Sequence, residues 1–179
     1  MNNGTVFAVH SFSEHAFAKT SRDEIEIIAG IGVAGDAHAG AKVQHLSRVR
    51  ADPNQPNLRQ VHLIHGELFD EIAASGFDVR PGQLGENITT SGVDLLALGR
   101  DDRIHIGNVV LRVTGLRNPC AQIEAFRQGL LQQLVYRDGD EIVRKAGIMT
   151  IAESGGKIRP GDSIEVEPAP GPRIKLDRA

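Results

Sequence analysis

Cysteine has the widest chemistry of any side chain in this sequence, and the chain contains one, Cys120. A lone cysteine has no intramolecular disulfide partner, so it is either a small buried side chain or a thiol with a chemical role. Cys120 ends the segment Thr114–Cys120, which leads from an expected strand into an expected short helix, and the N-terminus of such a helix favours an anion such as a thiolate. Arg117 lies three residues earlier and adds positive charge. We therefore favour a functional thiolate at Cys120 over a cysteine that only packs behind the turn.

A second polar group lies in the glycine-rich segment 35–40, which contains Asp36 and His38. These side chains have three possible roles: metal ligands, a polar pocket lining, or a turn in which Asp36 bonds its own backbone. Taken alone, the turn is the favoured interpretation. A zinc site would need two further ligands, and the remaining candidates show no standard metal-ligand spacing. Those candidates are the carboxylates and His45, His62 and His65.

A third group is the segment Arg80–Ile88, in which glycines on both sides of Gln83 allow close approach of the backbone. Glu86 supplies an acceptor, and the Asn87 amide can both donate and accept hydrogen bonds. Such an amide suits the alternating donor and acceptor edge of a pterin. The alternative is a bulged strand end with solvated polar groups, and the segment by itself does not decide between the two.

The elements that must position these groups are mostly strands. Short runs of alternating apolar residues recur between glycine-rich turns, and Gly107–Asn108 has the order of a two-residue type II′ hairpin turn. Further tight turns are expected at 155–156 and 159–162. The predicted strands are Val6–His10, Glu24–Ile28, Gln60–Ile64, Gln83–Thr89, Asp102–Ile106, Asn108–Thr114, Ile148–Glu153 and Ser163–Val166.

Helical periodicity is confined to three short segments, 66–76, 121–126 and 130–135. Eight short strands with few helices favour a mainly β barrel or sandwich over a doubly wound sheet. The proline-rich segment Ala51–Asn57 is predicted to be an exposed loop, too short to divide domains. We expect one domain over residues 1–167, followed by a flexible C-terminal tail at 168–179.

Composition and charge exclude several classes of partner. The formal net charge is −3 and basic residues form no run, so a nucleic-acid partner is not expected. The sequence has no secretory signal pattern and no apolar run of membrane-spanning length, which predicts a cytoplasmic protein with no membrane partner. Aromatic residues make up 4% of the chain, so aliphatic side chains must form the core.

Taken in order, these segments resemble the signature of the MOSC family, whose domain is similar to the C-terminal part of molybdenum cofactor sulfurases. The resemblance covers roughly residues 5–167, and five motifs occur in the family's order. The matching segments are GVAGDAHAG at 32–40, RQVHLI at 59–64, PGQLGENI at 81–88, TGLRNPC at 114–120 and RPGD at 159–162.

The resemblance implies a β-barrel whose mouth holds a molybdenum–pterin cofactor, with Cys120 as the essential side chain. In family members that transfer sulfur this cysteine carries it as a persulfide, and in those that reduce N-hydroxylated compounds it ligates molybdenum; both roles require a soft thiolate. By the same resemblance Arg117 and Arg59 are candidates for the pterin phosphate. The remaining candidates for the cofactor pocket are Asp36, His38, Asn87 and Thr114.

The sequence also departs from the larger members of the family. Nothing in 179 residues resembles the pyridoxal-phosphate domain of the full sulfurases or the extra N-terminal barrel of the amidoxime-reducing relatives, so no pyridoxal phosphate is expected on this chain. A sulfur donor, an electron donor or a molybdoenzyme would then have to act as partner. Two alternatives remain: a cofactor-free thiol hydrolase or transferase with a histidine base, and a non-catalytic module that binds a small anion.

Overall fold

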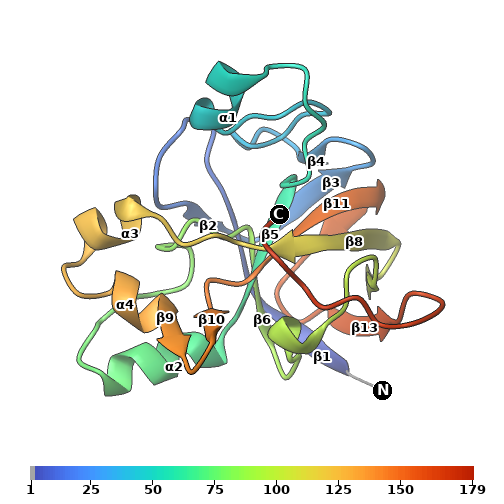
Figure 1. Ribbon diagram of the computed structural model, residues 1–179. Coiled ribbons are helices and arrows are strands. Elements are labelled where there is room, and N and C mark those ends of the chain that lie inside the picture. Colours follow the sequence, from blue (N-terminus) through green and yellow to red (C-terminus); the bar gives the residue numbers. More distant parts are fainter. Residues whose placement is uncertain (1–2) are drawn as a thin grey trace.

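The computed structural model describes residues 3–179 as a closed seven-strand barrel with short helices on its outside (Figure 1). The strands follow the order β13-β7-β8-β11-β5-β6-β1, and pairing of β13 with β1 closes the ring. All neighbours in the ring are antiparallel except β5 and β6, which are parallel. The barrel strands are β1 (Asn3–Ser11), β5 (Val61–His65), β6 (Ile88–Ser91), β7 (Arg103–Ile106), β8 (Val109–Leu116), β11 (Ile148–Ser154) and β13 (Ser163–Glu167).

Alternation of apolar residues explains how the barrel forms. In β7, Ile104 and Ile106 are fully buried while their neighbours are half-exposed, as expected of a strand with one face toward a core. Gly107 has φ of 57°, which its missing Cβ permits, and it joins β7 to β8 with Ile106 paired to Val109. The predicted hairpin turn and the mainly β barrel are therefore confirmed.

The helices lie on one side and at one end of the barrel. In Figure 1, α2 (Glu67–Ala74), α3 (Ala121–Phe126) and α4 (Leu131–Leu134) lie to one side, and α1 (Leu46–Ala51) lies at the top. A second apolar cluster holds α2, α3 and α4 against β5, with Ile64, Leu68 and Ile123 fully buried within it. The three predicted helical segments are confirmed, whereas α1 occupies positions for which the sequence indicated no helix.

Smaller strands complete the fold outside the barrel. β2 (Thr20–Arg22) pairs with β1, and β3 (Ile25–Ile28) lies between β4 (Gly32–Val33) and β12 (Gly156–Ile158). A separate hairpin consists of β9 (Val135–Asp138) and β10 (Glu141–Arg144). The sequence did not indicate β2, β4, β9, β10 or β12, which are two to four residues long; β4 is buried, and the other four are partly or largely exposed.

The predicted strand Gln83–Thr89 is largely wrong, because β6 begins only at Ile88. The preceding residues form turns that are held by the Glu86 carboxylate. Its Oε1 accepts hydrogen bonds from Gly82 N at 2.5 Å and from Thr89 Oγ1 at 3.0 Å, which ties the segment into a loop. This loop brings Gly85 and Asn87 to the end of the barrel near α1 and α3.

Residues 168–179, expected to be a flexible tail, instead pack along the barrel. Leu176 is 7% exposed and belongs to the main core. Leu116 N donates to Asp177 O at 2.7 Å, and Ala179 N donates to Leu116 O at 3.0 Å. The structure differs from the expectation because one buried leucine and backbone pairing with the end of β8 hold a segment whose prolines prevent regular structure.

Within residues 3–179, no helix has the length and hydrophobicity that a membrane span requires.

Candidate functional site

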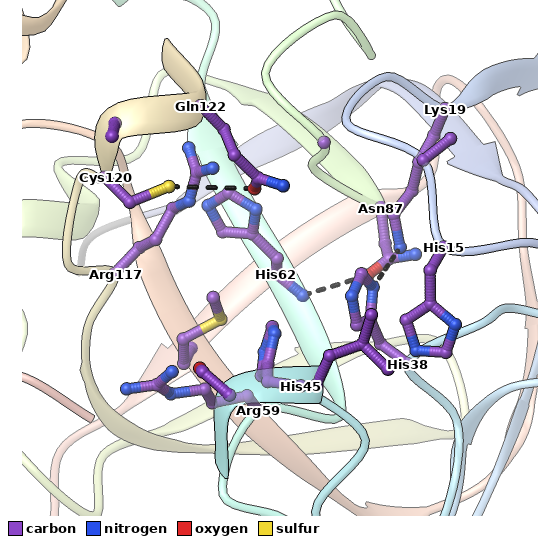
Figure 2. A pocket seen from close by; sticks show the side chains of 16 residues that line it. His15, Lys19, His38, His45, Arg59, His62, Asn87, Arg117, Cys120 and Gln122 are labelled. Carbon is purple, nitrogen blue, oxygen red and sulfur yellow. Dashed lines mark hydrogen bonds between the residues drawn. The ribbon is translucent and has the colours of Figure 1, made fainter. Parts of the chain in front are cut away.

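A cavity of about 430 Å³ brings together the end of β5, the 82–87 loop, the start of α3 and the loops around α1 (Figure 2). Its lining combines one thiol with three cationic side chains and four histidines. The lining residues are His15, Ala16, Lys19, His38, His45, Leu46, Ser47, Arg59, His62, Gly85, Asn87, Arg117, Cys120, Ala121, Gln122 and Met149.

Cys120 lies at the wall of this cavity, where the strand-to-helix turn predicted from the sequence places it. It is the residue immediately before α3, with extended backbone angles, and its side chain is partly exposed. Sγ donates a weak hydrogen bond to Gln122 Oε1 at 3.7 Å. Among residues 3–179 no histidine nitrogen lies within hydrogen-bonding distance of this sulfur, so the His base that a cofactor-free thiol hydrolase requires is not in place.

Arg117 extends into the cavity from the segment between β8 and Cys120. One of its terminal nitrogens, Nη1, is buried and has no hydrogen-bond partner among the described residues. Burial lowers the pKa of Arg117 from its usual value, and the negative charges available at Cys120 and Glu86 oppose that shift. A guanidinium that the protein leaves without a partner in a cavity is suited to an anionic ligand, because its planar fork matches phosphate and carboxylate.

Arg59 also lines the cavity, and its guanidinium is hydrogen-bonded by the chain itself. Its Nη2 donates to the backbone oxygen of Ala179, which also accepts a hydrogen bond from Arg48 at 3.1 Å. Burial, together with the charges of Arg48 and Arg117, lowers the pKa of Arg59 to about 10. The side chain therefore stays cationic at neutral pH, and the C-terminal residue lies directly beside the cavity.

Asp36 does not line the cavity but lies behind its wall, with its side chain fully buried. Oδ2 accepts hydrogen bonds from Lys19 Nζ at 2.6 Å and from His38 N at 3.2 Å, and Oδ1 accepts from Phe12 N at 3.1 Å. Burial alone would raise the pKa of Asp36, but the Lys19 charge and these hydrogen bonds outweigh it and lower the pKa. The turn interpretation is correct in part, since Asp36 binds the backbone two residues on.

His38 lines the cavity beside two further imidazole rings. Its ring centroid lies 4.6 Å from that of His45 and 5.6 Å from that of His15. Burial, followed by the positive charge of Lys19, lowers the pKa of His38 to about 4, and burial followed by the charge of His38 lowers that of His45 to about 3. Both rings are therefore neutral at physiological pH and offer one donor and one acceptor each.

Asn87 lines the cavity, but its amide is largely engaged by the backbone. Its Oδ1 accepts from His62 N at 3.1 Å, and its Nδ2 donates to His10 O at 3.3 Å. His62 in turn donates from Nε2 to Ala146 O at 2.7 Å. These contacts tie the loop before β6 to β5 and to β1, so Asn87 holds the cavity wall and has little hydrogen-bonding capacity left for a ligand.

Thr114, a candidate for the cofactor pocket, has a hydroxyl that is fully engaged in hydrogen bonds to backbone carbonyl groups. Its Oγ1 lies 2.6 Å from Leu58 O and 2.9 Å from Met149 O, and the residue does not line the cavity. Its single proton is shared between two carbonyl oxygens, which fastens β8 to the segment before β5. Thr114 and Asp36 therefore do not line this cavity, whereas Cys120, Arg117, Arg59, His38 and Asn87 all line it.

Sequence reasoning missed Lys19 and Gln122, and it considered His62 only among the possible zinc ligands. Lys19 had no signal, because its burial depends on an ion pair with a residue in another segment. Gln122 lies two residues after Cys120, just beyond the 114–120 motif, and its proximity to the thiol would have been a usable signal. Across residues 3–179, no group of three or more histidine, cysteine or acidic side chains has the geometry of a metal site.

Comparison with known proteins agrees with this architecture. The chain is similar over 93% of its length to the crystal structure of the YuaD protein from Bacillus subtilis, with 25% identity, 97% of that chain covered and a TM-score of 0.77. It is also similar in fold to the YiiM proteins of Escherichia coli and Geobacillus stearothermophilus, with 19% and 16% identity and TM-scores of 0.66 and 0.62. These two matches cover 96% and 90% of this chain and 73% of each YiiM chain.

No curated protein is significantly similar to the chain in sequence. The family model of the MOSC domain, however, matches residues 37–165, a span that contains all of α1 to β12 and begins in the glycine-rich loop that carries His38. This span is more than half of the chain and includes Cys120. The chain belongs to the MOSC domain family.

Proposed function

We propose that this protein binds the molybdenum cofactor in the cavity and uses Cys120 as a sulfur carrier or as a molybdenum ligand. The observation that carries the proposal is that the cysteine shares one cavity with Arg59 and with Arg117, whose Nη1 is buried without a partner. Membership of the MOSC family supports the choice of this cofactor over other anionic ligands.

The residues present fit such a group in size, charge and ligand type. A volume of about 430 Å³ lies within the range of small-molecule sites. A pterin phosphate requires cationic or backbone N–H donors, and Arg117 and Arg59 supply guanidinium groups. A thiolate is the soft ligand that suits molybdenum or a carried sulfur atom, and no other cysteine exists in the chain.

When bound, the cofactor would supply a redox-active metal, and the residues of the chain would hold and orient it. Arg117 and Arg59 would bind the anionic end, and the neutral rings of His38 and His45 would form part of the surrounding wall. Cys120 lies at the wall with its sulfur reachable from the cavity. Sulfur transfer then requires a sulfur donor and a receiving molybdoenzyme, whereas reduction of an N-hydroxylated compound requires an electron donor.

The test is the metal and pterin content of the protein after expression in a host that makes the cofactor, with molybdate in the medium. We expect wild-type protein to carry both, and Cys120→Ser to lose most of the molybdenum. Ser163→Ala, an exposed change on β13, is the matched control and should retain both. Wild-type protein that carries neither, and that does not bind cofactor added later, contradicts the proposal.

A further inference from the structure

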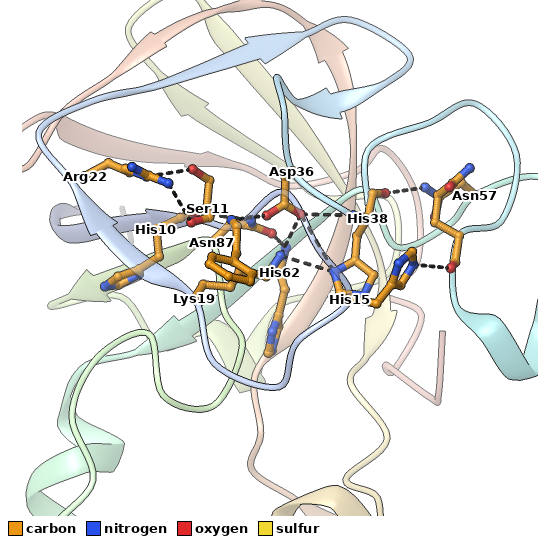
Figure 3. Close-up of polar contacts among 12 residues, drawn as sticks. His10, Ser11, His15, Lys19, Arg22, Asp36, His38, Asn57, His62 and Asn87 are labelled. Atoms are coloured by element: carbon orange, nitrogen blue, oxygen red, sulfur yellow. Dashed lines mark hydrogen bonds and ion pairs between the residues drawn. The ribbon is translucent and has the colours of Figure 1, made fainter.

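Lys19, Asp36 and His38 form a hydrogen-bonded cluster in and behind the cavity wall. Lys19 comes from the loop before β2, and Asp36 and His38 come from the glycine-rich loop after β4 (Figure 3). The Lys19 side chain is 3% exposed and that of Asp36 is not exposed at all. Burial of a lysine and an aspartate is costly unless the pair is well bonded, so the cluster is unlike an ordinary surface ion pair.

The hydrogen bonds of this cluster determine which nitrogen of His38 carries the proton. Lys19 Nζ lies 3.2 Å from His38 Nδ1 and 2.6 Å from Asp36 Oδ2. An ammonium group has three donors and no acceptor, so Nδ1 must be the acceptor in this contact. The proton of the neutral ring is therefore on Nε2.

Asp36 does not reverse this assignment. Its Oδ2 is 3.7 Å from His38 Nδ1, beyond hydrogen-bonding distance, and the same oxygen already accepts from Lys19 and from His38 N. A proton on Nδ1 would point at the Lys19 ammonium, which is closer. Asp36 thus holds Lys19 in place, and Lys19 holds the imidazole.

The opposite nitrogen of His38 is free to meet a ligand. The His38 side chain is 21% exposed and lines the cavity, and among residues 3–179 Nε2 has no hydrogen-bond partner. Burial, with the Lys19 charge as second cause, lowers the pKa of His38 to about 4, so the ring stays neutral near pH 7. The cavity therefore contains one imidazole N–H whose direction is set before any ligand arrives.

We infer that His38 donates a hydrogen bond from Nε2 to an acceptor atom of the bound cofactor, and that Lys19 is the positioning residue that fixes this tautomer. The identity of the ligand in this inference rests on the proposed function. The tautomer of His38 does not, because it is a property of the protein without any ligand. An acceptor such as a ring nitrogen, a carbonyl oxygen or an anionic oxygen fits opposite this N–H, and a ligand donor does not.

The tautomer is tested by NMR on free protein with ¹⁵N-labelled histidine, using long-range ¹H–¹⁵N spectra that distinguish Nε2–H from Nδ1–H. The His38 signals are identified by their absence from His38→Gln. Wild-type protein should show Nε2–H. Lys19→Arg, which keeps a donor, should retain it, and the double variant Lys19→Met, Asp36→Asn should populate Nδ1–H without leaving a buried unpaired charge. An Nδ1–H signal in wild type, or an unchanged spectrum in the double variant, overturns the inference.

The donation to the cofactor is tested by a matched pair of substitutions. A glutamine amide nitrogen reaches the position of Nε2, whereas an asparagine amide nitrogen reaches that of Nδ1, so His38→Gln keeps the proposed donor and His38→Asn removes it. After expression with molybdate, we expect the Gln variant to carry about tenfold more pterin than the Asn variant, the effect of one hydrogen bond to a polar or charged group. Equal pterin content in the two variants overturns this part.

The two tests also separate the inference from the proposed function. If wild-type protein carries no pterin, the proposed function fails, and with it the assignment of the acceptor to the cofactor. The NMR result then still decides whether Lys19 sets the His38 tautomer. If pterin is present but the two variants are equal, the proposed function stands and the role of His38 is wrong.

Discussion

Arg59 donates a hydrogen bond to the backbone oxygen of Ala179, which lies 120 positions later in the chain. This contact joins a residue of the cavity wall to the C-terminal segment. Arg48 donates to the same oxygen at 3.1 Å, so two cations of the cavity side meet there. The segment also pairs with Leu116, four residues before Cys120. The C-terminal segment is therefore part of the structure that shapes the site.

If the segment is packed as described, Leu176→Ala will destabilise the protein. Leu176 is 7% exposed, so its truncation removes buried apolar surface and leaves a cavity, at a cost of about 2–3 kcal/mol in the free energy of unfolding. Ile174→Ala is the control, because Ile174 is 55% exposed and should cost roughly 0.5 kcal/mol or less. Urea denaturation measures both, and equal small effects would show that the segment is not packed.

Arg117→Met should stabilise the cofactor-free protein while weakening its ability to hold the cofactor. The guanidinium is desolvated with one nitrogen unpartnered, and it offers only a long cation–π contact, 5.9 Å from the Phe17 ring centroid. Removal of the uncompensated charge should raise the free energy of unfolding by roughly 1 kcal/mol. Denaturant melts of apo protein and pterin analysis of loaded protein check the two halves. A variant that is less stable than wild type would mean that Arg117 has a structural partner.

Thr114→Val should behave in the opposite way, with lower stability and unchanged cofactor content. The hydroxyl proton is shared between two carbonyl oxygens, and its loss should cost about 1 kcal/mol. Thr114→Ser keeps the hydroxyl and serves as control. If pterin content falls in Thr114→Val but not in the serine variant, the prediction is wrong and the hydroxyl contributes to cofactor binding.

Stability should fall as the pH is lowered from 7 toward 5. Burial, followed by the charge of Lys19, lowers the pKa of both His10 and His38 to about 4, and burial followed by the charge of His38 lowers that of His45 to about 3. Below about pH 6.5 the unfolded chain binds protons at these histidines and the folded protein does not, so acid favours unfolding. Each histidine adds a slope of at most about 1.4 kcal/mol per pH unit.

The measurement is the urea midpoint at pH 7.5, 6.5 and 5.5. His10→Leu is an informative comparison, because His10 is fully buried and neither ring nitrogen has a hydrogen-bond partner among the described residues. This variant should lose about a fifth of the histidine slope, since burial also lowers the pKa of His62 and His65 and one of five groups is removed. A midpoint that does not change between pH 7.5 and 5.5 would show that these rings become protonated without unfolding.

Local signals were sufficient for the parts of the fold that depend on short segments. The Gly107–Asn108 turn and the helix Ala121–Phe126 were predicted at their observed positions, because turn chemistry and apolar spacing act within a few residues. Cys120 could be singled out for a similar reason, since it lies at a strand-to-helix turn that the sequence makes visible.

Long-range pairing explains what was missed. Lys19 is a charged residue beside Thr20 and Ser21, and nothing in those neighbours indicates that its side chain is buried. Only the approach of Asp36 from a different loop makes that burial possible. The start of β6 was misplaced for a related reason, because the carboxylate of Glu86 ties its own segment into a turn that residue type alone does not reveal.

Both strands that lead to the site are hydrogen-bonded along their two edges, β5 by β11 and β6, and β8 by β7 and β11. Such strands open only when the whole barrel unfolds, so their amide protons should exchange with solvent slowly. The loops that carry Lys19 and His38 have no such double pairing and can open at a lower free-energy cost. A bulky molecule that enters the cavity is therefore expected to displace these loops more readily than the barrel strands behind them.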